Sequence, residues 1–329
     1  MPRGSDSSGR RIRAPRGTIR PHPGFDEEAA LAQVRTLYRA LQRPVDTAAV
    51  ISVLTKYTLH ERKYVEDVYN VQHEPKLQHA LRAAFSYNAQ ATLLALLQWH
   101  NQFLAAAARR ALVARPTDKA TLIELFCGQS QDELRDMVRT YDRLHSRPLQ
   151  AELRAQLNGE LRQLALALTA LNRDQSEPPG DNAARELAGR LAAAGQGRDA
   201  EMFISAFSTV GYPLLRRAFE LLPEVNPSHA DIQTVIRASF GGDIRTGLLA
   251  VAQCVADQPG YFAERLYRAM RGLGTDDTAL IRILVSRAEN DLQNIKDAYH
   301  QRYGKSLAAA VEDDTSGTYW HCLRAIIKP

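Results

Sequence analysis

The stretch RAMRGLGTDD (268–277) ends a helical pattern in two glycines spaced by one residue, followed by Thr-Asp-Asp. A second acidic cluster, EDDTSG, places Asp314 forty positions after Gly274. Because glycine takes positive φ at little steric cost, Gly272 and Gly274 can turn successive carbonyl oxygens outward to one point. The carbonyls of Met270, Gly272 and Gly274, together with the Asp314 carboxylate, are ligands that Ca²⁺ accepts. The sequence predicts a calcium site at these four residues.

Such a cage leaves coordination positions open for water or for a phosphate headgroup. An open site of this kind binds calcium weakly on its own, with a dissociation constant on the order of 10⁻⁵ to 10⁻³ M. Arg271 lies between the ligands and would point near the same headgroup. The simpler interpretation is a glycine C-cap followed by a helix start, with Thr275 as N-cap and two aspartates in the first turn. It explains the loop but not the second carboxylate cluster.

The loop belongs to a unit that occurs four times along the chain. Each copy has helical stretches, then a short helical piece, a polar turn and an apolar helix, and the positions matching Asp314 are Ala84, Gln156 and Ser239. The spacings of these positions are 72, 83 and 75 residues. Apolar residues recur at intervals of three and four, with almost no strand pattern. We therefore predict an all-α chain of four units with about five short helices each.

The net charge of +5 is concentrated at the N-terminus. The first 25 residues hold six arginines and one aspartate, and the remaining acidic and basic residues balance. This distribution argues against a nucleic-acid-binding face. The stretch is rich in Arg, Pro, Gly and Ser, which predicts a disordered arm. The arm is either simply solvated or in contact with anionic lipid or an acidic partner.

Catalytic motifs are incomplete throughout the 329 residues. HERKY has Tyr64 where the second histidine of HExxH belongs, and CGQSQ (127–131) is not followed by the second glycine of G-x-S-x-G. The GLGTDD loop lacks the third glycine of a dinucleotide fingerprint and the lysine of a P-loop. We expect no enzyme activity.

The location predicted for the chain is cytoplasmic. No secretory signal opens the sequence, and Cys127, Cys254 and Cys322 are far apart in apolar contexts, as expected of structural thiols in a reducing compartment. The uncharged run from Ala83 to Ala108 contains too many amide side chains for a membrane span and is interpreted as parts of two helices with a link.

GLGTDD…DDTSG, with 38 residues between Thr275 and Asp314, resembles the calcium-binding signature of the annexin family. The following LIRILVSRAENDLQNIKDAYHQRYGKSL is very similar to an annexin fourth repeat, and the opening GTIRPHPGFDEEAAL is most like the subgroup of annexins one and two. The resemblance implies four annexin-type repeats of five short helices each, forming a slightly curved disc whose convex face carries the calcium loops. It supports the Met270, Gly272, Gly274 and Asp314 site.

The predicted organisation has a basic disordered tail, four repeats and one linker. The ranges are 1–24 for the tail, 25–98 for repeat 1, 99–171 for repeat 2, 172–181 for the linker, 182–256 for repeat 3 and 257–329 for repeat 4.

Repeats 1 to 3 depart from the family pattern. Pro44 stands at the second loop glycine of repeat 1, and Ala114 and Pro116 stand at both glycines of repeat 2. Repeat 3 keeps Gly197 in a shortened loop. Asp46, Asp118 and Asp199 remain and are assigned to helix capping rather than to ligation. Arg287, the arginine of the family's Ser-Arg pair, has Tyr57, Gln129 and Val210 at the matching positions.

One intact loop should bind membranes more weakly than several acting together. The resemblance implies calcium-dependent binding to acidic, phosphatidylserine-like phospholipid, peripheral location on membranes when calcium is present, and a role in membrane organisation or vesicle traffic. The tail, or self-association on the membrane, could compensate for the lost loops. The alternative is a calcium-independent membrane or protein scaffold that uses the basic tail.

The two prolines of RPHPG and the lack of an apolar helical pattern argue against an S100-type partner.

Overall fold

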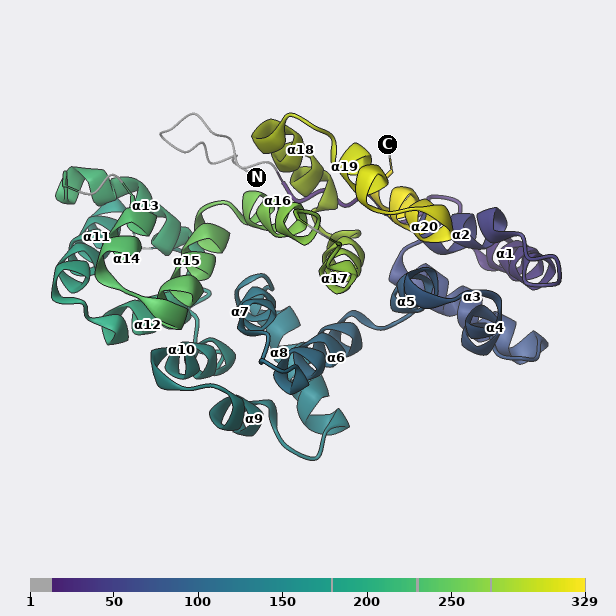
Figure 1. The fold of residues 1–329 in the computed structure, drawn as a ribbon, viewed down its shortest axis with the longest axis horizontal. Helices are drawn as coiled ribbons and strands as arrows, with labels where there is room; N and C mark the ends of the chain where they lie inside the picture. The colour runs from purple at the N-terminus through teal and green to yellow at the C-terminus, as the bar shows by residue number, and fades with distance from the viewer. Residues whose placement is uncertain (1–13, 179, 229–230, 273, 329) are drawn as a thin grey trace. The chain divides into compact units, whose positions relative to one another are not determined.

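The computed structural model describes residues 14–178, 180–228, 231–272 and 274–328. In these residues the chain forms 20 α-helices and no strand, which confirms the all-α prediction (Figure 1). The chain divides into two compact units: unit 1 runs to Trp99 and resumes at Phe262, and unit 2 runs from His100 to Tyr261.

Unit 1 combines helices from both ends of the sequence. Helices α2 and α5 pack against α20, and α5 also packs against α17, so the first and last sets of helices share one core. The helices are α1 (Glu27–Ala40), α2 (Thr47–Lys56), α3 (Leu59–Gln72), α4 (Leu77–Ala84), α5 (Tyr87–Ala95), α16 (Gln258–Ala269), α17 (Asp277–Arg287), α18 (Leu292–Tyr303), α19 (Leu307–Asp314) and α20 (Gly317–Ile327).

Unit 2 holds the middle of the chain. Here α10 packs against α12, and α7 packs against both α6 and α15. The helices are α6 (His100–Val113), α7 (Lys119–Cys127), α8 (Gln131–Leu144), α9 (Leu149–Gln156), α10 (Gly159–Thr169), α11 (Gly180–Gly197), α12 (Ala200–Thr209), α13 (Tyr212–Val225), α14 (Ile232–Ser239) and α15 (Gly242–Ala256).

The helices repeat in sets of five. The fourth helix of each set, α4, α9, α14 and α19, has eight residues and ends at the position matched to Asp314. The fifth helix then begins with a residue at positive φ: Tyr87 at 49°, Gly159 and Gly242 at 58°, and Gly317 at 61°. This common geometry supports the register between the copies, and the outer boundaries of the repeats stay a prediction.

Aspartates cap the second helix of every set, which confirms the assignment of Asp46, Asp118 and Asp199 to capping. The Oδ1 atoms of Asp46, Asp118, Asp199 and Asp276 accept backbone N–H groups at 3.0, 3.0, 3.0 and 2.9 Å. Each bond satisfies an amide that the first helical turn leaves without a partner. The N-cap of α17 is therefore Asp276, and the assignment of that cap to Thr275 is wrong by one residue.

The tail is not disordered along its whole predicted length of 24 residues. Residues 1–13 lie outside the described part of the chain. From residue 14 onward, the segment before α1 lies on unit 1, where the N–H of Thr18 donates to the Ala288 carbonyl at 2.8 Å. The Arg16 carbonyl accepts the Gln293 N–H at 2.9 Å. These long-range backbone hydrogen bonds explain why the basic composition did not predict the order of this segment.

The predicted linker, 172–181, is also held in place. The Asp174 N–H donates to the Thr209 carbonyl at 2.7 Å, and the Arg173 guanidinium lies 3.7 Å from the centre of the Tyr212 ring. Helix α11 already begins at Gly180, inside the predicted linker.

Among the described residues, no helix is long and apolar enough to cross a membrane. The uncharged run of Ala83 to Ala108 contains the end of α4, the whole of α5 and the first part of α6. The link expected between two helices is therefore a short helix of its own.

We expect the three cysteines to be inert toward thiol reagents in the folded protein. Cys127, Cys254 and Cys322 are at most 1% exposed, and burial raises the pKa of Cys127 well above its usual value and that of Cys322 to about 12. Because the thiolate is the reactive form, modification at pH 8 should be more than about 1,000-fold slower than in the unfolded chain. Titration with a chromogenic disulfide reagent, with and without guanidinium, measures this, and one rapidly modified cysteine in the native chain would contradict it.

Candidate metal centre

Two glycines in the turn between α16 and α17 have backbone angles that other residues rarely adopt. The φ angle of Gly272 is 115° and that of Gly274 is 85°. A Cβ atom added at either position would meet no atom within 4 Å. The backbone angle, rather than crowding, therefore requires glycine here. Both residues are exposed, so no packed side chain covers this part of the turn.

Thr275 joins this turn to the end of α19. Its hydroxyl donates to Asp314 Oδ2 at 2.6 Å and also lies 3.2 Å from the Asp314 carbonyl oxygen. The turn itself is closed by the Asp276 N–H, which donates to the Ala269 carbonyl at 2.8 Å. The structure thus brings the Asp314 carboxylate to the residue that follows Gly274. The sequence pattern did not predict this role of Thr275, because a threonine directly before two aspartates is also typical of a helix N-cap.

Asp314 is the acidic side chain that the loop can use. Its neighbour Asp313 pairs with Lys305, and Asp277 accepts a hydrogen bond from Asn88 Nδ2 at 2.6 Å. In the described residues, no three His, Cys, Asp or Glu side chains gather as a metal cluster. A cation at this loop would therefore depend on backbone carbonyls and one carboxylate. That is an oxygen-only donor set, suited to a hard cation such as Ca²⁺ and unsuited to zinc, which prefers nitrogen and sulfur.

Three tyrosines of α16 and α18 pack against one another. Tyr267 stacks on Tyr303 with ring centres 4.1 Å apart, and Tyr299 lies against Tyr303 at 4.9 Å. Burial raises the pKa of Tyr299 to about 12, with smaller contributions from the neighbouring tyrosines and from the negative charge of Asp314. Tyr299 is therefore neutral at physiological pH and adds no charge to the site.

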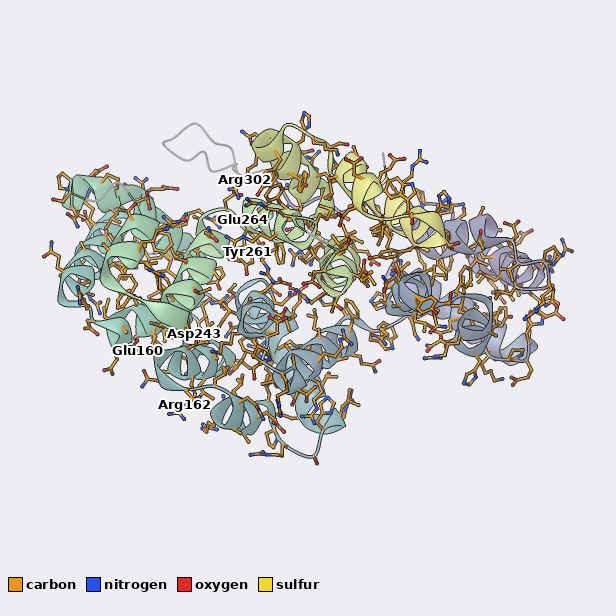
Figure 2. All side chains as sticks on the ribbon, in the orientation of Figure 1. Glu160, Arg162, Asp243, Tyr261, Glu264 and Arg302 are labelled. Atoms are coloured by element: carbon orange, nitrogen blue, oxygen red, sulfur yellow. The ribbon has the colours of Figure 1, made fainter. Side chains whose placement is uncertain are left out.

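Arg271 has an exposed side chain whose guanidinium carbon lies 6.0 Å from the centre of the Tyr267 ring. This is the outer limit of a cation–π contact. On α16, the helix of Tyr267, Glu264 pairs with Arg302 of α18 at 3.4 Å (Figure 2). Contact of Arg271 with a membrane phosphate stays a prediction.

The other three sets close the same turn with fewer residues or different ones. The hydrogen bond runs from Asp118 to Ala111 at 3.0 Å in repeat 2, a loop as long as that of repeat 4. It runs from Asp46 to Ala40 at 2.9 Å in repeat 1, one residue shorter. In repeat 3 it runs from Asp199 to Ala194 at 2.8 Å, two residues shorter.

The shortening in repeat 3 removes the loop almost completely. Helix α11 continues to Gly197, the glycine that the sequence pattern placed in the loop, and Arg198 takes positive φ, at 56°, directly before the capping Asp199. The hydroxyl of Ser239, which stands in the place of Asp314, donates back to the Val235 carbonyl at 2.7 Å. Neither element resembles the turn of repeat 4.

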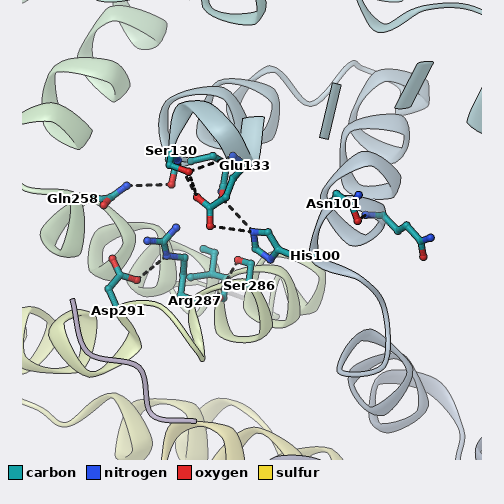
Figure 3. A network of polar contacts seen from close by, with 12 residues as sticks. His100, Asn101, Ser130, Glu133, Gln258, Ser286, Arg287 and Asp291 are labelled. Atoms are coloured by element: carbon teal, nitrogen blue, oxygen red, sulfur yellow. Dashed lines mark hydrogen bonds and ion pairs between the residues drawn. The ribbon is translucent and has the colours of Figure 1, made fainter. Parts of the chain in front are cut away.

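The arginine of the Ser-Arg pair in repeat 4, Arg287, forms a buried ion pair with Asp291. Arg287 Nε donates to Asp291 Oδ1 at 2.7 Å, and both side chains are only 5% exposed (Figure 3). The guanidinium also lies 4.7 Å from the centre of the Phe262 ring. Figure 3 also draws a pair of unit 2, in which His100 Nε2 lies 3.8 Å from Glu133 Oε1.

Known proteins are similar to this sequence along nearly its whole length. The family model described as Annexin matches residues 103–168 and 261–326. Annexin A13 of Mus musculus is 34% identical over 314 residues, which cover 93% of this chain and 96% of that protein. Annexin A1 of Homo sapiens is 33% identical over 316 residues, with 95% and 90% covered.

Solved structures share the fold as well. Annexin III matches with a TM-score of 0.90 and 28% identity, covering 96% of this chain and 98% of its own. Chicken annexin V in complex with Zn²⁺ has a TM-score of 0.87 at 27% identity, with 96% and 99% covered. Calcium-bound annexin (Sm)1 has a TM-score of 0.86 at 27% identity, with 96% and 94% covered. With this sequence identity over nearly its full length, the chain belongs to the annexin family, whose members generally bind phospholipid in a calcium-dependent manner.

Proposed function

We propose that this annexin binds acidic phospholipid membranes in a calcium-dependent manner through one site in repeat 4. The ligands are the carbonyl oxygens of Met270, Gly272 and Gly274 and the carboxylate of Asp314. The remaining coordination positions are left to water and to a headgroup phosphate, with Arg271 beside it. The chain is peripheral on phosphatidylserine-containing membranes and serves membrane organisation or vesicle traffic without catalysis.

One observation carries this proposal: the hydrogen bond between Thr275 and Asp314, which holds a single carboxylate beside a turn of two positive-φ glycines. A calcium ion accepts carbonyl oxygens together with a bidentate carboxylate and tolerates irregular geometry. The match to a calcium-bound annexin structure adds support from a relative. The proposed site leaves coordination positions unfilled by the protein, and a headgroup phosphate completes them.

The test is co-sedimentation of the full chain with vesicles of phosphatidylserine and phosphatidylcholine. At physiological ionic strength, where salt screens contacts between exposed charges, pelleting with the phosphatidylserine vesicles should require calcium. Magnesium should not replace calcium, because it demands near-ideal octahedral geometry and keeps its own water. Pelleting that is the same with calcium, with magnesium and with a chelator would overturn the proposal.

Replacing Thr275 with valine should raise the calcium concentration needed for half-maximal vesicle binding. Valine keeps the shape of the side chain but removes the hydroxyl that donates to Asp314 Oδ2. Loss of a group that orients a metal ligand generally costs about 10- to 100-fold in metal affinity. Thr275→Ser keeps the hydroxyl and is the matched control. An unchanged calcium requirement for the valine variant would show that this hydrogen bond does not position the ligand.

A further inference from the structure

Two of the loops that lack the calcium ligands carry an exposed arginine in their place. Arg43 in repeat 1 and Arg115 in repeat 2 are each followed by proline, one further residue and the capping aspartate. The loop of repeat 2 has the same length as that of repeat 4, so Arg115 occupies the position between the two glycine counterparts, Ala114 and Pro116.

The guanidinium of Arg115 lies against carbonyl oxygens of its own loop. Its Nη1 atom is 3.2 Å from the Ala114 carbonyl oxygen and 3.4 Å from that of Val113. Ala114 is the counterpart of Gly272, whose carbonyl is a proposed calcium ligand. In repeat 2, a positive charge therefore lies beside the Ala114 carbonyl. The matching carbonyl in repeat 4, that of Gly272, is the one proposed to bind calcium.

In the described part of the chain, no carboxylate forms an ion pair with Arg115. Gln156 stands at the end of α9, which packs against α6, the helix that leads into the loop. Two residues earlier, Arg154 is exposed and contacts the Gln150 side chain at 3.5 Å. Within the described residues, neither Arg115 nor Arg154 has an ion pair. The loop of repeat 2 and the end of α9 therefore each carry an arginine whose positive charge is present without calcium.

Repeat 1 has the same combination of residues. Arg43 is exposed, and no carboxylate pairs with it in the part of the chain that the structure describes. Ala84 ends α4 in the place of Asp314, and the exposed Arg82 precedes it by two residues and contacts the Gln78 carbonyl at 3.4 Å. In repeat 4 the residue at the place of Arg82 is Glu312, also exposed.

We propose that the Arg43 and Arg115 loops bind the phosphate of anionic phospholipid headgroups without calcium. The inference rests on the proposed function, since both assume that the chain binds acidic phospholipid membranes. A guanidinium is always charged and presents a planar fork of donors that matches phosphate oxygens, so it can take over the charge that calcium supplies in repeat 4. Pro44 and Pro116 restrict the backbone directly after each exposed arginine.

The ligand is a lipid surface rather than a soluble phosphate. Each loop offers one exposed guanidinium, so a single free phosphate would gain little from it. A membrane presents many headgroups at once, and each basic residue near an anionic surface adds to the same binding event. The protein therefore has a basal, salt-sensitive affinity for anionic membranes, to which the repeat 4 site adds a calcium-dependent part.

The experiment compares R43Q/R115Q with R35Q/R143Q in the full chain. The control pair removes the same charge from one exposed arginine in each unit, away from these loops, and neither control residue has an ion pair in the described structure. Binding to phosphatidylserine vesicles is measured in chelator at low ionic strength. Each lost arginine should weaken binding about fivefold, so the loop pair loses about 25-fold and the control pair no more than about twofold. R43K/R115K keeps the charge and should retain most of the binding, and thermal unfolding checks that all variants fold.

Each remaining outcome has one meaning. Equal losses in R43Q/R115Q and R35Q/R143Q, or no binding of wild type in chelator, would overturn this inference and leave the calcium-dependent function standing. A basal affinity that disappears on deletion of residues 1–13, but not in R43Q/R115Q, would assign it to the tail and also overturn the inference. Inorganic phosphate should compete no better than chloride at equal ionic strength, and stronger competition would point to a soluble ligand instead.

Discussion

Replacing Asp314 with alanine is expected to abolish calcium-dependent binding of this annexin to phosphatidylserine vesicles. Asp314 supplies the carboxylate of the proposed site, and its counterparts Ala84, Gln156 and Ser239 cannot chelate as a carboxylate does. Loss of a group that merely orients a ligand costs about 10- to 100-fold in metal affinity, so loss of the ligand itself should exceed about 100-fold. Calcium titrations of vesicle co-sedimentation measure the effect.

Asp313 provides the matched control for this experiment. It is the adjacent residue, its side chain is 70% exposed, and it pairs with Lys305 rather than with the calcium loop. Asp313→Ala removes the same charge from the same turn and should leave the calcium requirement within about twofold, as expected for an exposed ion pair. If both variants lose binding equally, net charge rather than ligation controls it. If Asp314→Ala still binds at the wild-type calcium concentration, the site lies elsewhere.

The sequence predicted helix content and register well because both depend on local patterns. Apolar residues at intervals of three and four define the helices, and the aspartates before α2, α7 and α12 cap them as expected. The internal repeat then matched Asp314 with the last residues of α4, α9 and α14, positions that the structure makes equivalent.

Tertiary contacts explain what the sequence did not predict. The hydroxyl of Thr275 suits a helix cap one residue too early, but it serves a carboxylate 39 positions away. The segment around Thr18 reads as disordered by composition, yet its backbone pairs with Ala288, 270 positions along the chain. Gly197 resembles a loop glycine, and the shortened turn leaves it in α11. Local propensity carries no information on such partners.

The order of the N-terminal segment changes how the tail should be tested. A deletion that includes residues 14–22 would remove Arg16, which pairs with Asp297 at 2.6 Å, and Ile19, which is 1% exposed. Loss of binding could then follow from damage to unit 1. A deletion of residues 1–13 removes four arginines and keeps these contacts, so it tests the charge of the tail alone.

Arg287 is expected to be the most sensitive charged residue of unit 1. Arg287→Met should lower the free energy of unfolding by about 3 to 5 kcal/mol, because it leaves Asp291 buried without its positive partner. The ion pair lies at the connection between α17 and α18. At the same connection, the Ala288 carbonyl accepts backbone N–H groups of the N-terminal segment. Repeats 1 and 2 secure this joint differently, with capping boxes of Thr58 and Glu61 and of Ser130 and Glu133.

Denaturant unfolding of three variants separates the burial of charge from the loss of a surface pair. Lys305→Met breaks an exposed ion pair in the same unit and should cost no more than about 1 kcal/mol. Arg287→Met/Asp291→Asn removes both charges and should be more stable than Arg287→Met alone, since the uncompensated carboxylate is gone. A double variant as unstable as the single one would place the cost in the packing of the guanidinium against Phe262 instead. In that case the arginine acts in repeat 4 through its contact with the ring, and the tyrosine, glutamine and valine at the matching positions would fill space rather than replace a charge.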